Sequence, residues 1–145
     1  MSTNGEIAAG LMRDGFACSQ AVLAMFCENY GLEKTTALRI ACGLAGGVKS
    51  GDVCGAVSGA ALVVGLKYGH HDAADKAGKA LCGEKVKAFV AAFRERKGSI
   101  VCREILGIDI STPEGLKEAK TAKLFETVCE GLVATAVDIL EETGY

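Results

Sequence analysis

Apolar residues recur at helical spacing along almost the whole chain. One set follows the i, i+3, i+4, i+7, i+8 spacing of a single buried helical stripe: Cys18, Ala21, Val22, Met25 and Phe26. Similar spacing predicts helices over about 7–13, 35–41, 72–97 and 121–142, and a short helix from Ser99. No alternating period-two run competes with them. The pattern predicts an all-α chain that forms one domain over residues 1–145.

The segment from Val53 to Tyr68 is apolar on all sides. Such a helix is normally buried all round, so we expect it at the centre of a compact helical bundle. A loop with four glycines precedes it, at Gly43, Gly46, Gly47 and Gly51, and Asp52 is the expected N-cap. Elsewhere, glycine should end helices at Gly31, Gly98 and Gly107, and Thr112-Pro113 should begin one.

Composition narrows the class of protein. Hydrophobic residues make up 50% of the 145 positions, enough for one self-sufficient core. The net charge of -2 argues against a nucleic-acid binder. The longest uncharged stretch, Val53 to Leu66, is shorter than the roughly 20 residues of a membrane span. With no secretory signal at the start, we expect a cytoplasmic protein without a membrane span.

Seven cysteines are the unusual feature. An odd number cannot all pair within one chain, so thiol or metal chemistry in a reducing compartment is favoured over a disulfide framework. Cys18, Cys54 and Cys102 each fall in or next to the first turn of a predicted helix, where free N–H groups stabilise a thiolate. Cys129 lies on the apolar stripe of the last helix and should face the core.

A free cysteine is also a common small core residue. We assign Cys27, Cys42 and Cys82 mainly to that role, although Cys42, beside the glycine loop, could reach the site. The face formed by Lys117, Lys120 and Lys123 is interpreted as solvated, and His70-His71 as a helix cap or a solvent-exposed pair.

Two-cysteine motifs are absent from the chain. Without CxxC or CxxCH it carries no zinc ribbon, thioredoxin motif, bacterial ferredoxin run or covalent c-type haem site. A site assembled from separate helices is still open, because bundle cores do hold cofactors in this way. Gly55 and Gly59 form a ridge that would let a cofactor or another helix approach, either within the chain or in a homodimer.

The order of the cysteines resembles that of a family of redox-active proteins named for its pattern C, CGAxxG, C, C. The matching segments are GFACSQAV with Cys18, CGAVSG from Cys54 to Gly59, CREILG with Cys102 and VCEGLV with Cys129. The resemblance covers nearly the whole chain. It implies that these four cysteines form one site. A similar module occurs in split-Soret cytochromes, where four cysteines suggest an iron-sulfur centre.

Three functions follow as hypotheses. In the first, Cys18, Cys54, Cys102 and Cys129 hold an iron-sulfur cluster, 2Fe-2S or 4Fe-4S, and the chain exchanges electrons with a redox partner protein. In the second, a metal-free dithiol-disulfide oxidoreductase or sulfur carrier, Cys54 is the nucleophile and Cys18 or Cys102 resolves the mixed disulfide. In the third, the cysteines only pack a helical interaction module. The first requires all four sulfurs to converge, and the second needs Cys54 near its resolving cysteine.

Overall fold

A computed structural model describes residues 2–145. The α-helices are α1 (Thr3–Arg13), α2 (Cys18–Phe26), α3 (Lys34–Cys42), α4 (Gly55–Tyr68), α5 (Lys76–Lys97), α6 (Cys102–Leu106), α7 (Pro113–Thr121) and α8 (Glu130–Glu142). Shorter helical turns of other pitch cover Cys27–Tyr30 and Phe125–Cys129. Gly47–Gly51 forms an irregular turn in which Val48 and Lys49 have left-handed φ values. Within the described residues there is no strand, only an isolated β-bridge between Val53 and Val101. The all-α prediction is confirmed.

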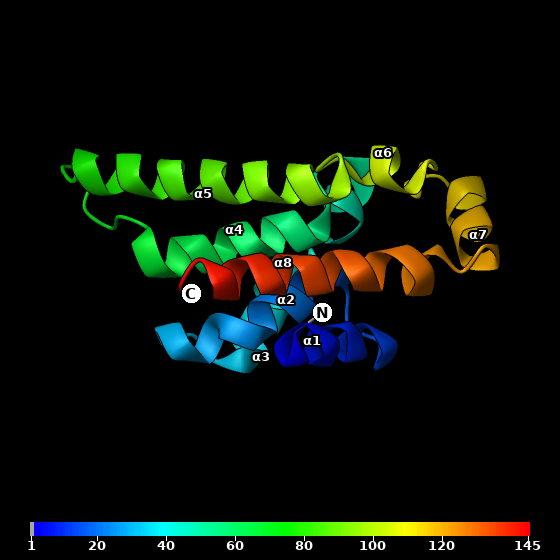
Figure 1. The fold of residues 1–145 in the computed structure, drawn as a ribbon, viewed down its shortest axis with the longest axis horizontal. Helices are drawn as coiled ribbons and strands as arrows, with labels where there is room; N and C mark the ends of the chain where they lie inside the picture. The colour runs from blue at the N-terminus through cyan, green and yellow to red at the C-terminus, as the bar shows by residue number, and fades with distance from the viewer. Residues whose placement is uncertain (1) are drawn as a thin grey trace.

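The helices form a bundle in which α4 and α8 lie between α5 on one side and α1, α2 and α3 on the other (Figure 1). The inner helix α4 contacts α2, α5 and α8. Its buried residues are Gly55, Ala56, Val57, Gly59, Ala60, Val63 and Val64. This packing on several sides confirms the central position predicted from its uniformly apolar sequence. No helix within residues 2–145 has the length and apolar character that a membrane crossing requires.

Helices α2 and α4 approach closely because α4 carries glycine where they meet. A Cβ at Gly59 would lie 2.7 Å from the backbone oxygen of Ser19. Ser19 itself is fully buried, and its Oγ donates a hydrogen bond to the carbonyl of Ala41 at 2.7 Å. The glycine ridge of Gly55 and Gly59 therefore packs against α2 within the chain. A homodimer that uses this ridge stays a prediction.

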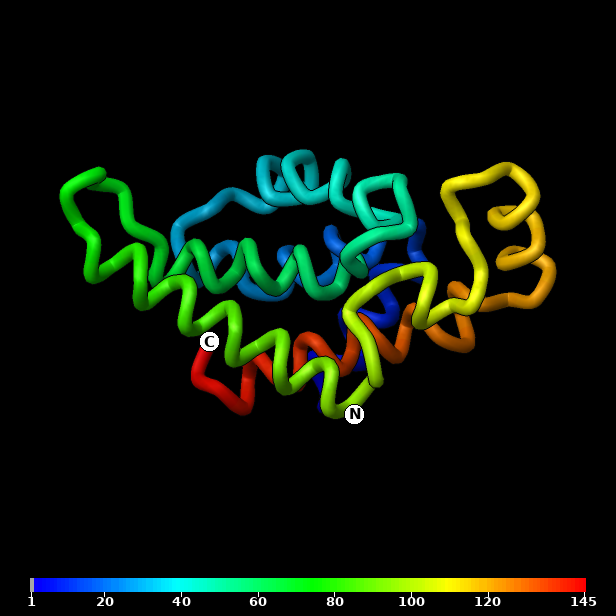
Figure 2. Tube along the Cα trace, turned by 90° about the horizontal axis from the view of Figure 1, so that it is seen from above, coloured from blue at the N-terminus to red at the C-terminus, as the bar shows by residue number. Residues whose placement is uncertain are grey.

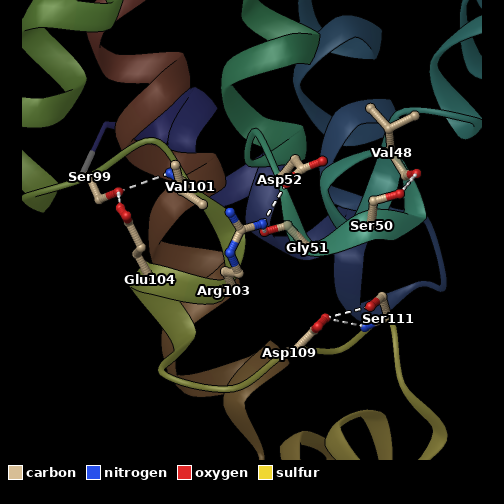
Figure 3. Close-up of polar contacts among 10 residues, drawn as sticks. All are labelled: Val48, Ser50, Gly51, Asp52, Ser99, Val101, Arg103, Glu104, Asp109 and Ser111. Carbon is tan, nitrogen blue, oxygen red and sulfur yellow. Dashed lines mark hydrogen bonds and ion pairs between the residues drawn. The ribbon is translucent and has the colours of Figure 1, made fainter.

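The start of α4 differs from the sequence prediction. The predicted N-cap, Asp52, is wrong: Cys54 is the N-cap and the helix begins at Gly55. The chain runs through Val53 as a single bridge to Val101 before it turns into the helix. The Asp52 carboxylate consequently pairs with Arg103 instead of capping α4 (Figure 3).

A similar shift occurs at α5. Asp75, not Asp72, caps this helix, because its side chain accepts a hydrogen bond from the backbone N–H of Gly78 at 2.9 Å. Asp72 instead accepts from the N–H of Ala74 within the preceding turn, also at 2.9 Å. The predicted glycine end at Gly98 is confirmed, with φ of 84° in the left-handed region.

The last predicted helix is interrupted. α7 ends at Thr121, Lys123 takes a left-handed φ of 56°, and α8 begins only at Glu130 after the turn Phe125–Cys129. This break lets α7 lie across the end of the bundle, as Figures 1 and 2 both show. The start of α7 is as predicted, with the Thr112 hydroxyl accepting from the N–H of Gly115 and Pro113 in the first turn.

Candidate functional site

A cavity of about 700 Å³ opens beside α6 and α7. Its walls come from segments spread over the whole chain, between Met12 and Leu132. They include all four cysteines that the sequence singled out: Cys18, Cys54, Cys102 and Cys129. The bundle therefore brings side chains from four separate elements to the same space.

Cys18 is the first residue of α2 and lies against the start of α4. A Cβ at Gly55 would overlap the Cys18 Sγ atom, so any other residue at position 55 would displace this sulfur. The start of α2 is fixed by Gln20, whose side-chain oxygen accepts a hydrogen bond from the N–H of Ala17 at 2.9 Å. Glycine at position 55 thus places the Cys18 sulfur beside the residue that follows Cys54.

Cys54 and Cys102 are placed together by backbone hydrogen bonds. The N–H of Cys54 donates to the carbonyl of Ile100 at 2.7 Å, and the N–H of Cys102 donates to the carbonyl of Asp52 at 2.6 Å. Each cysteine then starts its own helix, Cys54 as the N-cap of α4 and Cys102 as the first residue of α6. The two helix starts are consequently held side by side.

Arg103 ties the same two segments together from outside. Its Nη1 donates to the carbonyl of Gly51 at 3.2 Å and pairs with the Asp52 carboxylate (Figure 3). Ser99 holds the segment before α6, because its Oγ accepts a hydrogen bond from the N–H of Val101 at 3.0 Å. These contacts fix the backbone on both sides of the pair formed by Cys54 and Cys102.

Cys129 ends the turn Phe125–Cys129 and leads into α8. Its side chain is half-buried and lines the cavity with Phe125 and Leu132. Cys129 therefore faces inward, as predicted, but toward the cavity and not into the buried core cluster.

The other three cysteines lie away from the cavity lining. Cys27 is fully buried and Cys82 is partly buried against the core, which fits their predicted packing role. Cys42 is exposed and does not line the cavity, so its assignment as a core residue or a spare at the site is wrong. The pair His70-His71 is exposed, as expected.

Burial favours the neutral thiol at Cys54, Cys102 and Cys129. Burial raises the pKa of Cys54 to about 12 and that of Cys102 to about 11, and it also raises the pKa of Cys129. In each case the neighbouring Cys18 adds to the effect. The N–H groups of Ala56 and Val57 lower the pKa of Cys54, as expected at a helix start, but burial outweighs them.

The four cavity cysteines are the candidate ligands for a metal or a cluster. Over residues 2–145, no three or more His, Cys, Asp or Glu side chains are grouped so that they could hold a metal ion. Four cysteine sulfurs around one cavity are nevertheless the number and type of ligand that iron-sulfur clusters use.

Two lysines line the cavity although their sequence contexts mark neither as a site residue. The sequence predicts a solvated face for Lys120 and no role for Lys49. Lys49 follows the adjacent glycines Gly46 and Gly47, the one local signal of an unusual backbone there. For Lys120 the sequence holds no such signal, because the break after α7 sets its position.

Comparison with known proteins supports the same cysteine pattern. No curated protein and no solved structure matches the chain. A family model described as "Putative redox-active protein (C_GCAxxG_C_C)" matches residues 16–143, a range that contains all four cavity cysteines and the box from Cys54 to Gly59. The chain belongs to this C_GCAxxG_C_C family.

Proposed function

We propose that Cys18, Cys54, Cys102 and Cys129 hold an iron-sulfur cluster, 2Fe-2S or 4Fe-4S, and that the chain transfers electrons between partner proteins. One observation carries the proposal: four cysteines from four elements line a single cavity. Cysteine thiolates are the usual ligands of such clusters. When bound, the cluster would supply one-electron chemistry.

The raised thiol pKa values fit this role. Deprotonation of several buried thiols would place thiolate charges close together, which is unfavourable. A bound cation offsets this repulsion, so the thiols lose their protons readily when a cation binds to the sulfurs. At Cys54, the N–H groups of Ala56 and Val57 point to the sulfur and would stabilise it as a ligand. Hydrogen bonds of this kind to ligand sulfur raise a cluster's reduction potential.

The second candidate is metal-free dithiol-disulfide exchange. It is favoured by the closeness of Cys18 to the start of α4 and by its effect on the pKa of Cys54, which is second only to burial. The Cys54 thiolate would attack a substrate disulfide and release one substrate thiolate. Cys18 would then displace the second substrate thiol, leaving a Cys18–Cys54 disulfide for an external dithiol to reduce. A Cys54 pKa of about 12 makes the attacking thiolate scarce, so this candidate ranks second.

Anaerobic reconstitution of the full chain with ferrous iron and sulfide tests the cluster. We expect a brown protein with visible charge-transfer absorption and stoichiometric iron and sulfide. The variants Cys54→Ser and Cys129→Ser should lose this absorption, whereas Cys82→Ser, outside the cavity, should keep it.

A folded chain that stays colourless and free of iron after reconstitution would overturn the cluster proposal. Mild oxidation of the metal-free chain then tests the second candidate. Peptide mapping should find a Cys18–Cys54 disulfide that a dithiol reduces, and its absence after oxidation would remove that candidate as well.

A further inference from the structure

The cavity offers more than sulfur. Its walls are largely apolar, and two lysine side chains stand among them. We propose that it binds a small organic anion, with the apolar body of the ligand against the cavity wall and its anionic group at Lys49 and Lys120. This inference goes beyond the proposed function, because it requires no metal.

The apolar wall is built from several elements. Phe16 comes from the loop before α2, Ile110 from the loop before α7, Leu116 from α7 and Phe125 from the turn before α8. The volume of about 700 Å³ is within the range of roughly 300 to 1,000 Å³ typical of small-molecule sites.

The two lysines supply positive charge without a counter-charge of their own. Both are exposed, and neither forms an ion pair in the part of the chain that the structure describes. Among the described residues, neither Asp52 nor Asp109 forms an ion pair with a lysine. Asp52 pairs with Arg103, and Asp109 accepts hydrogen bonds from the N–H and hydroxyl of Ser111 (Figure 3). An anionic ligand would therefore meet unneutralised ammonium groups.

The backbone that carries Lys49 is strained. Residues 46–49 all have left-handed φ values, and the last two are not glycine: Val48 has φ of 58° and Lys49 has φ of 56°. Hydrogen bonds hold this turn, from the N–H of Val48 to the carbonyl of Leu44 and from the N–H of Asp52 to the carbonyl of Gly47. Such strain persists where the surrounding structure fixes it, and it concentrates at ligand sites.

A pair of fluorescent probes separates the two parts of the site. The anionic probe is 1-anilinonaphthalene-8-sulfonate, and the neutral probe is N-phenyl-1-naphthylamine, which has the same rings without the sulfonate. Titrations use the metal-free, reduced chain of residues 1–145. We expect both probes to bind saturably at one site per chain.

Lysine variants then assign the anionic contact. Lys49→Gln and Lys120→Gln should each weaken binding of the anionic probe about tenfold, the effect of one charge-assisted contact, and leave the neutral probe unchanged. Lys117→Gln is the matched control, because Lys117 lies on the same helix but does not line the cavity. It should leave both probes unchanged.

A cavity-filling variant, Ile110→Trp, gives a second measurement. It should abolish binding of both probes while circular dichroism shows a folded chain. Probe binding that survives this variant, or anionic binding that Lys117→Gln weakens as much as Lys120→Gln, would overturn the proposal. Because no iron is present, either outcome leaves the cluster test independent.

Discussion

Glycines within α4 meet different surroundings, although their sequence contexts look alike. Gly59 faces the backbone of Ser19, while Gly65 has no neighbouring atom within 4 Å of an added Cβ. The sequence predicted a ridge that something approaches, but not whether α2, a cofactor or another chain would occupy it. That choice depends on the relative positions of whole helices, which single residues do not encode.

Replacing Gly59 should therefore be costly. In Gly59→Ala the new methyl group would meet the Ser19 backbone at 2.7 Å, and overpacking of this kind destabilises by about 1–3 kcal/mol. Gly65→Ala is the control: with open space around it, alanine's better helix propensity should raise stability by up to about 1 kcal/mol. Urea unfolding measures both. Equal effects in the two variants would contradict the close approach of α2 and α4.

For the cysteines too, the sequence predicts position along the chain but not tertiary surroundings. Their positions at helix starts were predicted correctly for Cys18, Cys54 and Cys102. The expected lowering of thiol pKa was wrong for Cys54 and Cys102, because the sequence shows the helix start but not the depth of burial.

At the scale of elements, ends marked by glycine were predictable and ends set by packing were not. Gly98 and Gly107 end α5 and α6 with φ of 84° and 70°. The break after α7 follows good helix formers and comes at a lysine, Lys123, so no local residue indicates it.

The left-handed backbone at Lys123 predicts that a glycine there stabilises the protein. Lys123→Gly should stabilise the fold by roughly 0.5–1 kcal/mol, because glycine adopts a left-handed φ without a Cβ clash. Lys117→Gly, inside α7, should destabilise it by about 1 kcal/mol. Thermal unfolding followed by circular dichroism compares them. Loss of stability in both variants would argue against the left-handed turn.

At the scale of the whole molecule, the chain needs its complete bundle to form the site. The four site cysteines could be predicted from the sequence, because their order along the chain matches the family pattern. The cavity itself, its volume and the lysines at its wall depend on how α6, α7 and the turn before α8 close over the ends of α2 and α4. Those arrangements follow from tertiary packing, which has no periodic signature.

The buried thiols also predict how stability changes with pH. The pKa of Cys54 in the folded chain, about 12, exceeds the ordinary value of 9.0, so the folded state keeps a proton that the unfolded state loses. The stabilising effect is complete below pH 9 and declines as the pH rises toward 12, by about 1.4 kcal/mol per pH unit for this thiol. Cys102 acts in the same direction.

Urea unfolding of the reduced, metal-free chain at pH 8 and pH 10.5 measures this decline. A double variant, Cys54→Ser with Cys102→Ser, is the comparison and should lose less stability over the same interval. If the two proteins declined in parallel, the alkaline sensitivity would come from other groups, and the burial of these thiols would not be its cause.

The wide separation of Cys18 and Cys129 along the chain has a consequence for biosynthesis. While the polypeptide is still being synthesised, Cys18 is present without Cys129, so the set of four cavity cysteines is incomplete. If the proposed cluster binds there, its insertion would follow translation, and newly made molecules would first carry free thiols.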